Sequence, residues 1–171
     1  CGAGGFMSES GLSIPKGEDC PPVYMHSSTV NADCEIWRET VWMRKNHCRV
    51  DIDVNADEGY RPWLKIVSDV CGYDVYGKPV EGDFESRKRV DEEYSCSFTL
   101  PRQTDDLMTL EIDEGDGILK RFSLGEYIAS TGYDWDAPDL HDIHIELDFA
   151  VTQIVLKVSG WDGEHKFDIV I

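Results

Sequence analysis

Apolar and polar residues alternate most regularly between Asp139 and Trp161. The apolar side chains of residues 143–149 occupy every second position, and carboxylates and a histidine occupy the positions between them. Residues 154–159 alternate in the same way after a short break. A period of two is typical of a β-strand with one buried face, so the pattern predicts two strands. Their short connection predicts an antiparallel hairpin.

The run Lys166–Ile171 is a third alternating segment, and it follows an Asp-Gly turn sequence. A tight turn would place this run back against residues 154–159, where intramolecular pairing has a high effective concentration. We therefore expect this strand to complete the sheet of its own chain, with Phe167 and Ile169 toward the core. The alternative is a strand that adds to the sheet edge of a neighbouring subunit.

Shorter alternating runs occur earlier in the chain, separated by Gly, Pro and Asp turns. Strands are expected at Ile36–Met43, Cys48–Val54, Trp63–Val70, Tyr94–Leu100, Leu107–Ile112 and Ile118–Phe122. Ser123 and Glu126 have the spacing of a capping box, which predicts one short helix over residues 123–128. Seven to nine short strands with one short helix predict an all-β fold, an antiparallel Greek-key β-sandwich.

The first part of the chain has a different texture. Residues 1–33 are rich in Gly, Ser and Pro and lack a long alternating run. Such a composition is typical of a flexible linker. We therefore expect a flexible N-terminal tether over residues 1–33 and one β-sandwich domain over residues 34–171.

The charge of the chain is strongly acidic. Asp and Glu number 34 against 16 Lys and Arg, which gives a formal net charge of −18. Binding to nucleic acid needs clustered basic residues, so nucleic acid is excluded as a partner. Residues 105–148 carry thirteen acidic and two basic side chains. This pattern indicates a solvated acidic face, with a cation-binding surface as the alternative.

Cysteine usage raises two questions. The sequence starts Cys-Gly-Ala-Gly-Gly, as a bacterial lipoprotein does after its signal peptide is cleaved, so Cys1 is the predicted lipidation site; an arbitrary start of the sequence is the alternative. The other cysteines show no C-x-x-C pair. We expect Cys48, Cys71 and Cys96 to behave as small apolar residues. Pairing of Cys20 with Cys34 stays open.

Motifs of catalysis are absent from the sequence: there is no G-x-S-x-G, H-E-x-x-H or phosphate-binding Gly-Lys loop. His141 and His144 would point to opposite faces of a strand and would not bind one ion together. We therefore expect no catalytic residue, no metal and no cofactor, and a protein that is not an enzyme. Trp135 and Trp161 are candidates for a surface that contacts a partner or a glycan.

A series of motifs between Val41 and Ile171 resembles one protein family. In order, they are M-R-K-N-H-C-R-V-D-I-D-V, G-Y-D-V-Y-G-K-P-V-E-G-D-F, F-S-L-G-E-Y-I, D-L-H-D-I-H-I-E-L-D-F and V-S-G-W. This order resembles the fimbrillin-A-associated anchor proteins, minor subunits of the type V fimbriae of Bacteroidales. Members of that family usually have two sandwich domains, whereas this chain has room for one.

The resemblance implies a transthyretin-like sandwich, a lipidated N-terminal cysteine that matches Cys1, and a surface-exposed lipoprotein of the cell outer membrane. It implies a fimbrial anchor or minor subunit that acts in fimbrial assembly or adhesion, with other fimbrial subunits as partners. A function of a different class also fits the sequence, namely a surface module that binds a glycan or a peptide through Trp135 and Trp161.

Overall fold

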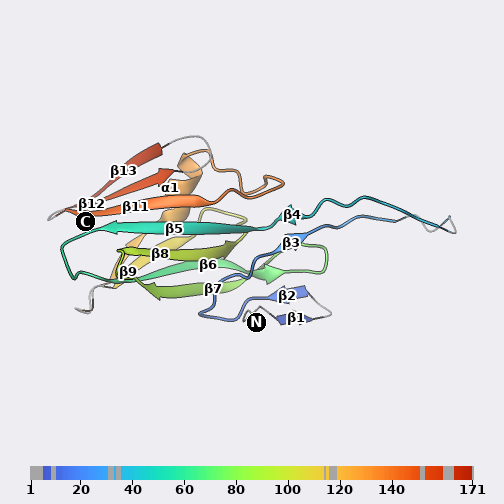
Figure 1. Cartoon of the computed structure of the whole chain (residues 1–171), viewed down its shortest axis with the longest axis horizontal. Helices are drawn as coiled ribbons and strands as arrows, with labels where there is room; N and C mark the ends of the chain where they lie inside the picture. Colours follow the sequence, from blue (N-terminus) through green and yellow to red (C-terminus); the bar gives the residue numbers. More distant parts are fainter. Residues whose placement is uncertain are drawn as a thin grey trace.

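Two β-sheets stacked face to face form the body of the described structure (Figure 1). The computed structural model describes residues 6–8, 11–30, 33, 36–113, 115, 119–150, 153–159 and 164–170. The first sheet has the order β13-β12-β11-β5-β8. The second has the order β1-β2-β6-β9-β10, with β7 paired to β6, and β3 pairs with β4 separately.

The bounds of the elements are as follows. The first sheet contains β5 (His47–Asn55), β8 (Ser95–Pro101), β11 (Ile143–Ala150), β12 (Gln153–Ser159) and β13 (Glu164–Val170). The second contains β1 (Phe6–Ser8), β2 (Gly11–Ser13), β6 (Trp63–Tyr73), β7 (Pro79–Arg89), β9 (Thr109–Asp113) and β10 (Leu119–Phe122). The remaining elements are β3 (Tyr24–Met25), β4 (Arg44–Lys45) and the helix α1 (Leu124–Ser130).

The core lies between the two sheets and is made by every second residue of their strands. Fully buried side chains from the first sheet are Val50, Ile52, Phe98, Leu100, Ile145 and Leu147, and those from the second include Leu64, Ile66, Leu110 and Ile112. Alternation therefore predicted the buried face of these strands correctly, because successive side chains of a strand point to opposite sides of its sheet. The predicted all-β sandwich is confirmed.

The C-terminal pairings also follow the prediction. β11 and β12 form an antiparallel hairpin with Ile145 opposite Val158, and β12 pairs antiparallel with β13, with Ile154 opposite Ile169. The last strand thus completes the sheet of its own chain. The side chains of Phe167 and Ile169 lie outside the described residues, so their direction stays a prediction.

One pairing departs from the expected antiparallel pattern. β11 lies parallel to β5, with Ile143 opposite Val50 and Ile145 opposite Ile52. In the sequence, the two strands are separated by β6 to β10 and by α1. Alternation reports which face of a strand is buried, but it carries no information on which distant strand becomes the neighbour.

The helix α1 begins one residue after the expected range and ends two residues after it, and it is held in place differently from the prediction. Ser123 is its N-cap residue but makes no side-chain capping bond, so the predicted capping box is wrong. Instead, Gly125 donates its N–H to the carbonyl of Met108 at 2.8 Å. A Cβ on Gly125 would lie 2.3 Å from the carbonyl oxygen of Asp106. The helix therefore needs glycine here to approach the backbone of the neighbouring segment.

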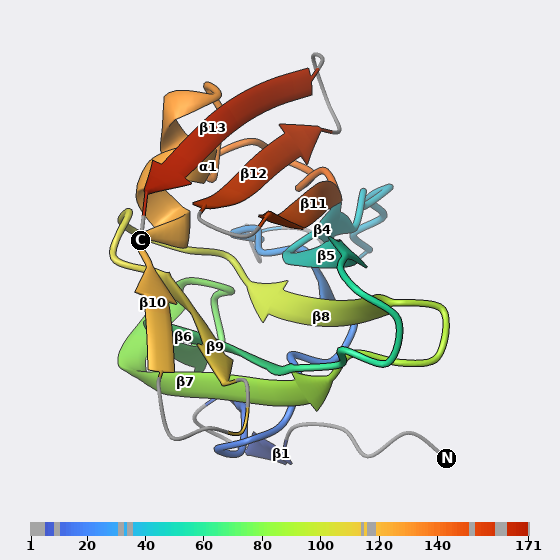
Figure 2. The same ribbon diagram turned by 90° about the vertical axis from the view of Figure 1, so that its left-hand side faces the viewer.

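The N-terminal residues 11–25, called the strap below, do not form a free tether. Leu12, Ile14, Cys20 and Val23 are buried in the core. The strap follows the gap between β7 and β8, on the side of the sandwich opposite α1 (Figure 2). The apolar residues of the strap are irregularly spaced among Gly and Pro, which is why the sequence pattern predicted a flexible linker. In the structure, packing against two sheet edges orders this segment.

Backbone bonds attach the strap to both sheets. Ile14 donates its N–H to the carbonyl of Cys71 at 2.9 Å, Gly17 to Glu85 at 3.0 Å and Cys20 to Thr99 at 2.9 Å. Lys88 of β7 completes the attachment. Its ammonium group lies 2.5 Å from a carboxylate oxygen of Asp19 and 5.2 Å from the ring centre of Phe98. The strap thus closes one side of the sandwich and excludes water from the core.

Cys20, Cys48, Cys71 and Cys96 are free thiols. Burial, joined by the negative charge of Asp19, raises the pKa of Cys20 to about 12. Burial likewise raises the pKa of Cys48 and of Cys96 to about 12. The prediction that Cys48 acts as a small apolar residue is confirmed, because it is fully buried. Cys34 lies outside the described residues.

Among the carboxylates of the described β-strands, only that of Glu111 is buried, with 3% of its side chain exposed. It lies 2.5 Å from the ammonium group of Lys65 and accepts a hydrogen bond of 2.8 Å from Nε of Arg121. Burial raises the pKa of Glu111, but the hydrogen bonds and charges of Lys65 and Arg121 lower it more, so it lies below its ordinary value. The folded state therefore favours the carboxylate form.

The first prediction concerns the strap. A Cβ on Gly72 would lie 2.1 Å from the carbonyl oxygen of Leu12, so Gly72→Ala should push the strap off β6. We expect a loss of about 1–3 kcal/mol in the free energy of unfolding in urea. Peptide-resolved alkylation at pH 8 should show faster modification of Cys20. Ser13→Ala, at an exposed position of the strap, is the control. An unchanged Cys20 rate in Gly72→Ala would contradict the strap's role.

The second prediction concerns pH. Because the folded-state pKa of Glu111 is depressed, its contribution is complete above the ordinary value of 4.5 and is lost as the pH falls through the folded-state pKa. Glu111→Gln should cost about 1–3 kcal/mol near pH 7 and show a weaker fall in stability below pH 4.5. Urea unfolding between pH 3 and 7 measures both effects. The exposed Glu58→Gln is the control, and equal acid slopes for Glu111→Gln and the wild type would contradict the assignment.

Candidate functional site

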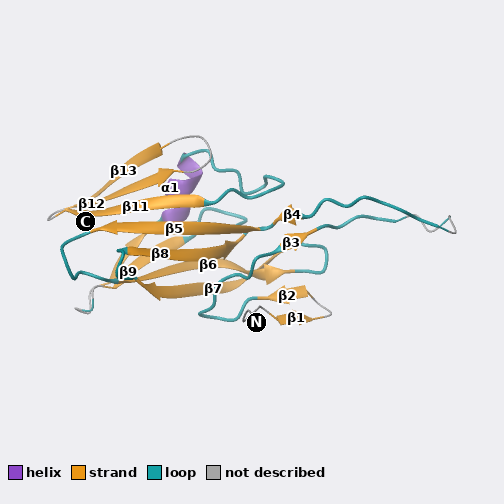
Figure 3. Ribbon diagram, viewed as in Figure 1, coloured by secondary structure: helices purple, strands orange, loops and turns teal. Residues whose placement is uncertain are grey.

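A long hairpin, called the arm below, projects from one end of the sandwich. It comprises residues 26–43, of which 26–30, 33 and 36–43 are described. Its two limbs continue from β3 and β4 and run side by side away from the sheets (Figure 1), and their described residues contain no further strand (Figure 3). Nδ1 of His26 lies 3.3 Å from the carbonyl oxygen of Trp42, which links one limb to the other.

Large apolar side chains are concentrated on the arm and its base. Twelve such residues are exposed in the described chain, and seven of them lie between residues 24 and 43. The seven are Tyr24, Val30, Ile36, Trp37, Val41, Trp42 and Met43. Trp42 is 79% exposed and Ile36 is 75% exposed. A cluster of this kind on the surface of a folded domain indicates an interaction surface.

The structure corrects the expected strand at Ile36–Met43. Only Arg44 and Lys45 belong to a strand, β4, and a one-residue interruption at Asn46 separates it from β5. Asn46 donates its N–H to the carbonyl of Val23 at 2.9 Å. The residues before β4 have no sheet beside them, so their apolar side chains stay in solvent. The run Ile36–Met43 is therefore exposed, because no strand of the described chain pairs with it.

The base of the arm is firmly held by two carboxylates from the loop before β11. Asp139 accepts a hydrogen bond of 2.7 Å from the backbone N–H of Lys45. Asp142 lies 2.6 Å from the ammonium group of Lys45 and accepts the N–H of Arg49 at 2.9 Å. Burial raises the pKa of Asp142, but Lys45 and the Arg49 N–H lower it more, and it lies below its ordinary value.

A second set of contacts ties the base to the strap and to the second sheet. The N–H of Val23 donates to Nδ1 of His47 at 3.0 Å. The hydroxyl of Tyr73, at the end of β6, donates to the carbonyl of Asn46 and accepts the N–H of Arg102, the latter at 2.6 Å. Both sheets therefore hold the point from which the arm projects, so the direction of its base is fixed.

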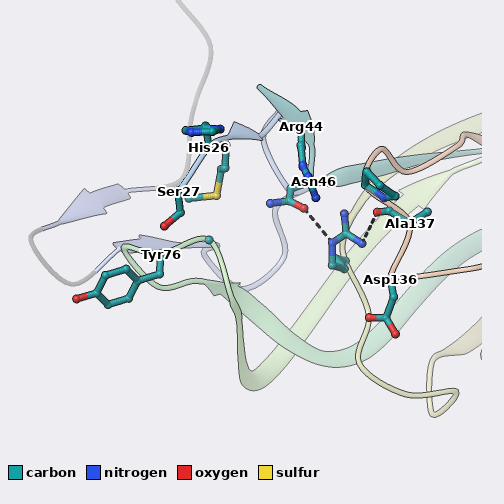
Figure 4. A pocket seen from close by; sticks show the side chains of 11 residues that line it. His26, Ser27, Arg44, Asn46, Tyr76, Asp136 and Ala137 are labelled. Carbon is teal, nitrogen blue, oxygen red and sulfur yellow. Dashed lines mark hydrogen bonds between the residues drawn. The ribbon is translucent and has the colours of Figure 1, made fainter. Parts of the chain in front are cut away.

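A pocket of about 430 Å³ lies beside the base of the arm (Figure 4). Its lining comes from the first residues of the arm, β4, the loop between β6 and β7, and the loop before β11: Met25, His26, Ser27, Arg44, Asn46, Tyr76, Gly77, Arg102, Asp136, Ala137 and Pro138. The volume is within the range of small-molecule sites.

The guanidinium group of Arg102 gives the pocket a fixed positive wall. It donates from Nε to Oδ1 of Asn46 at 2.9 Å, as drawn in Figure 4, and from one terminal nitrogen to the carbonyls of Trp135 and Ala137, the latter at 2.9 Å. Neither Arg102 nor Arg44 has a carboxylate within 4.0 Å among the described residues. Chemically, such a pocket suits an anionic or hydrogen-bonding group.

Of the residues proposed from the sequence, the structure describes Trp135. Trp135 is half-buried and packs edge-on against Tyr133, with 4.6 Å between the ring centres. It lies next in sequence to residues 136–138 of the pocket. Cys1 and Trp161 lie outside the described residues, so the lipidation site and the second tryptophan stay predictions.

Sequence reasoning missed Trp37 and Trp42 as surface residues. The signal was present in the run Ile36–Met43, where apolar residues occupy adjacent positions, so that both faces of an extended segment are apolar. The same run predicts a strand, because apolar residues are more often core residues than exposed ones.

Searches for two other kinds of site gave the following results. Within the described residues, no group of three or more His, Cys, Asp or Glu side chains is placed to hold a metal ion. No helix in the described part of the chain is long and apolar enough to span a membrane.

Comparisons with known proteins give a fold likeness. No protein-family model and no curated protein sequence matches the chain. The fimbrial anchor protein Mfa2 from Porphyromonas gingivalis superposes with a TM-score of 0.50 over 75% of this chain, at 18% identity. The fold resembles that of a fimbrial anchor protein. A crystal structure of a candidate adhesin from Bacteroides ovatus gives a TM-score of 0.52 over 73% of this chain, at 10% identity.

The likeness confirms, at the level of the fold, the resemblance predicted from the sequence motifs. The chain covers 50% of Mfa2 and 50% of the adhesin candidate, so it spans about half the length of these neighbours. At these identities the shared property is the fold. Activities and partners of the neighbours apply to this chain as proposals.

The third prediction tests how the arm is held. Asp142→Ala removes the carboxylate that contacts the ammonium group of Lys45 and accepts the backbone N–H of Arg49. We therefore expect a loss of about 1–3 kcal/mol in the free energy of unfolding. The amides of Lys45 and Arg49 should exchange faster with deuterium, because the arm base opens locally. Asp136→Ala, an exposed residue of the same loop, is the control. Unchanged exchange at both amides in Asp142→Ala would show that the base is held elsewhere.

Proposed function

We propose that the protein is a lipid-anchored cell-surface protein that acts as a fimbrial anchor or minor subunit in fimbrial assembly or adhesion. The observation that carries the proposal is the fold, which three quarters of the chain share with the fimbrial anchor protein Mfa2. Other fimbrial subunits are the proposed partners, and the outer surface of the cell is the proposed location. The proposed role is structural and involves no catalysis.

The pairing of β13 supports a holding role. This strand pairs with β12 of its own chain along seven residues, from Glu164 to Val170. A strand used in its own sheet is not presented to the sheet edge of a neighbour. Within the described chain, the segment left to reach a partner is the arm.

Cys1 is the proposed point of attachment to the outer membrane. A net charge of −18 gives the protein no electrostatic attraction to acidic lipid headgroups. Attachment would therefore depend on the acyl chains, and stable anchoring takes more than one of them. Several acyl chains on a single cysteine meet that requirement.

Glycan or peptide binding is the less supported function. It was based on Trp135 and Trp161, and part of the Trp135 ring is covered by Tyr133. A sugar-stacking platform needs an open aromatic face. The polar pocket beside the arm gives this alternative its remaining support.

The fourth prediction tests anchoring in the native bacterium. Deletion of the gene should release fimbriae into the medium, and re-expression of the wild-type protein should restore them to the cells. Cys1→Ser should fail to restore them and should move from the detergent phase to the aqueous phase in a cloud-point separation. Mass spectrometry of the wild-type protein should find acyl groups on Cys1.

Cys34→Ser is the matched control and should behave as the wild type does. Fimbriae that stay on the cells after gene deletion would contradict the anchor function. Normal retention of fimbriae by a Cys1→Ser protein in the aqueous phase would contradict the lipid attachment and leave a fimbrial role in place.

A further inference from the structure

We infer that the arm is a docking element that inserts into an apolar groove of a partner protein, with its free peptide groups pairing with a strand of that partner. The inference rests on the proposed function only for the identity of the partner, a fimbrial subunit. The mode of docking follows from the arm itself.

The apolar side chains of the arm cover both of its faces. Ile36 and Trp37 are adjacent in sequence, and Val41, Trp42 and Met43 are consecutive. Successive side chains of an extended chain point in opposite directions, so the limb of residues 36–43 carries apolar groups on two sides. A flat surface would cover one side only. A groove that surrounds the limb covers both, which requires insertion rather than contact with one face.

The described peptide groups of the arm also lack backbone partners. Among its described residues, no backbone N–H or C=O has a backbone partner beyond the β3–β4 pair at the base. An extended segment with open peptide groups is a template for strand addition. Eight residues, 36–43, would span about 27 Å if fully extended, which is the length of an eight-residue strand.

These unpaired groups disfavour a lipid bilayer as the occupant. Peptide groups without partners are costly in hydrocarbon, where no water can satisfy them. The arm also carries charges: Asp33 lies near its tip, and Arg38 and Glu39 lie within one limb. Nε1 of Trp37 donates to the carboxylate of Glu39 at 3.3 Å, so a charged group accompanies this tryptophan. Burial of such a pair in lipid is expensive.

A second copy of the chain is disfavoured by charge. Two molecules that each carry a net charge of −18 repel one another as they approach. A different protein with a less acidic surface meets no such barrier. Because Lys45, Asp139 and Asp142 fix the base of the arm, docking needs less ordering at that end.

The test uses fimbrial shafts purified from the native bacterium as the probe, with immobilised protein that carries Cys1→Ser. Wild-type protein should bind the shafts, and Trp37→Ser combined with Trp42→Ser should weaken binding by at least about 30-fold, as expected of central aromatic side chains. Leu107→Ser removes an equally prominent apolar residue away from the arm and should bind as the wild type does. The melting temperature of each variant checks that it folds.

A second variant replaces residues 27–42 by Asn-Gly, which keeps β3 and β4 joined, and it should not bind. Hydrogen exchange tests the pairing directly: amides of residues 26–30 and 36–43 should exchange at least about tenfold more slowly on shafts, which side-chain contact alone would not produce.

The possible outcomes separate the two proposals. Shaft binding that survives both arm variants overturns the docking role and leaves the anchor function standing. Absence of shaft binding by the wild-type protein overturns both. Binding to vesicles of the bacterial lipids, or self-association in sedimentation, that depends on Trp37 and Trp42 identifies a membrane or a second copy as the occupant and overturns the inference.

Discussion

The parallel pairing of β5 with β11 is the contact on which the remaining architecture depends. β5 lies between β8, the edge strand of its sheet, and β11, the central strand, and the arm leads into β5 through β4. The pairing brings the loop before β11 to the start of β5. Asp142 then reaches Lys45 and Arg49, and the thiol of Cys48 lies 3.2 Å from the carbonyl of His141.

The strap covers the side of the sandwich where the edges of the two sheets do not meet. Two stacked sheets leave apolar side chains exposed where their edges do not meet, and β7 and β8 form such a pair of edges. The strap covers this gap with Leu12, Ile14 and Cys20, while Asp19 neutralises Lys88. Helix α1 lies on the opposite side of the sandwich. The strap and α1 therefore cover opposite sides of the core.

The arm differs from both because it stabilises nothing in its own domain. Its limbs add exposed apolar side chains, which are unfavourable in water, and peptide groups that have no backbone partner within the described domain. The contacts at its base show that this exposure has a fixed position. A feature that does not help folding and is nevertheless held in place is best explained by a partner, which agrees with the proposed role in fimbrial assembly.

The sequence by itself determined the elements and their buried faces. Alternation placed β5, β8, β11 and the C-terminal hairpins, because side-chain direction along a strand is a local property with a period of two. Motif order indicated the family whose fold the chain shares. Tertiary structure alone decided the parallel neighbour of β5, the ordering of the strap and the exposure of Ile36–Met43. Each of these depends on whether a distant edge is present to bury an apolar residue, and local sequence carries no record of that.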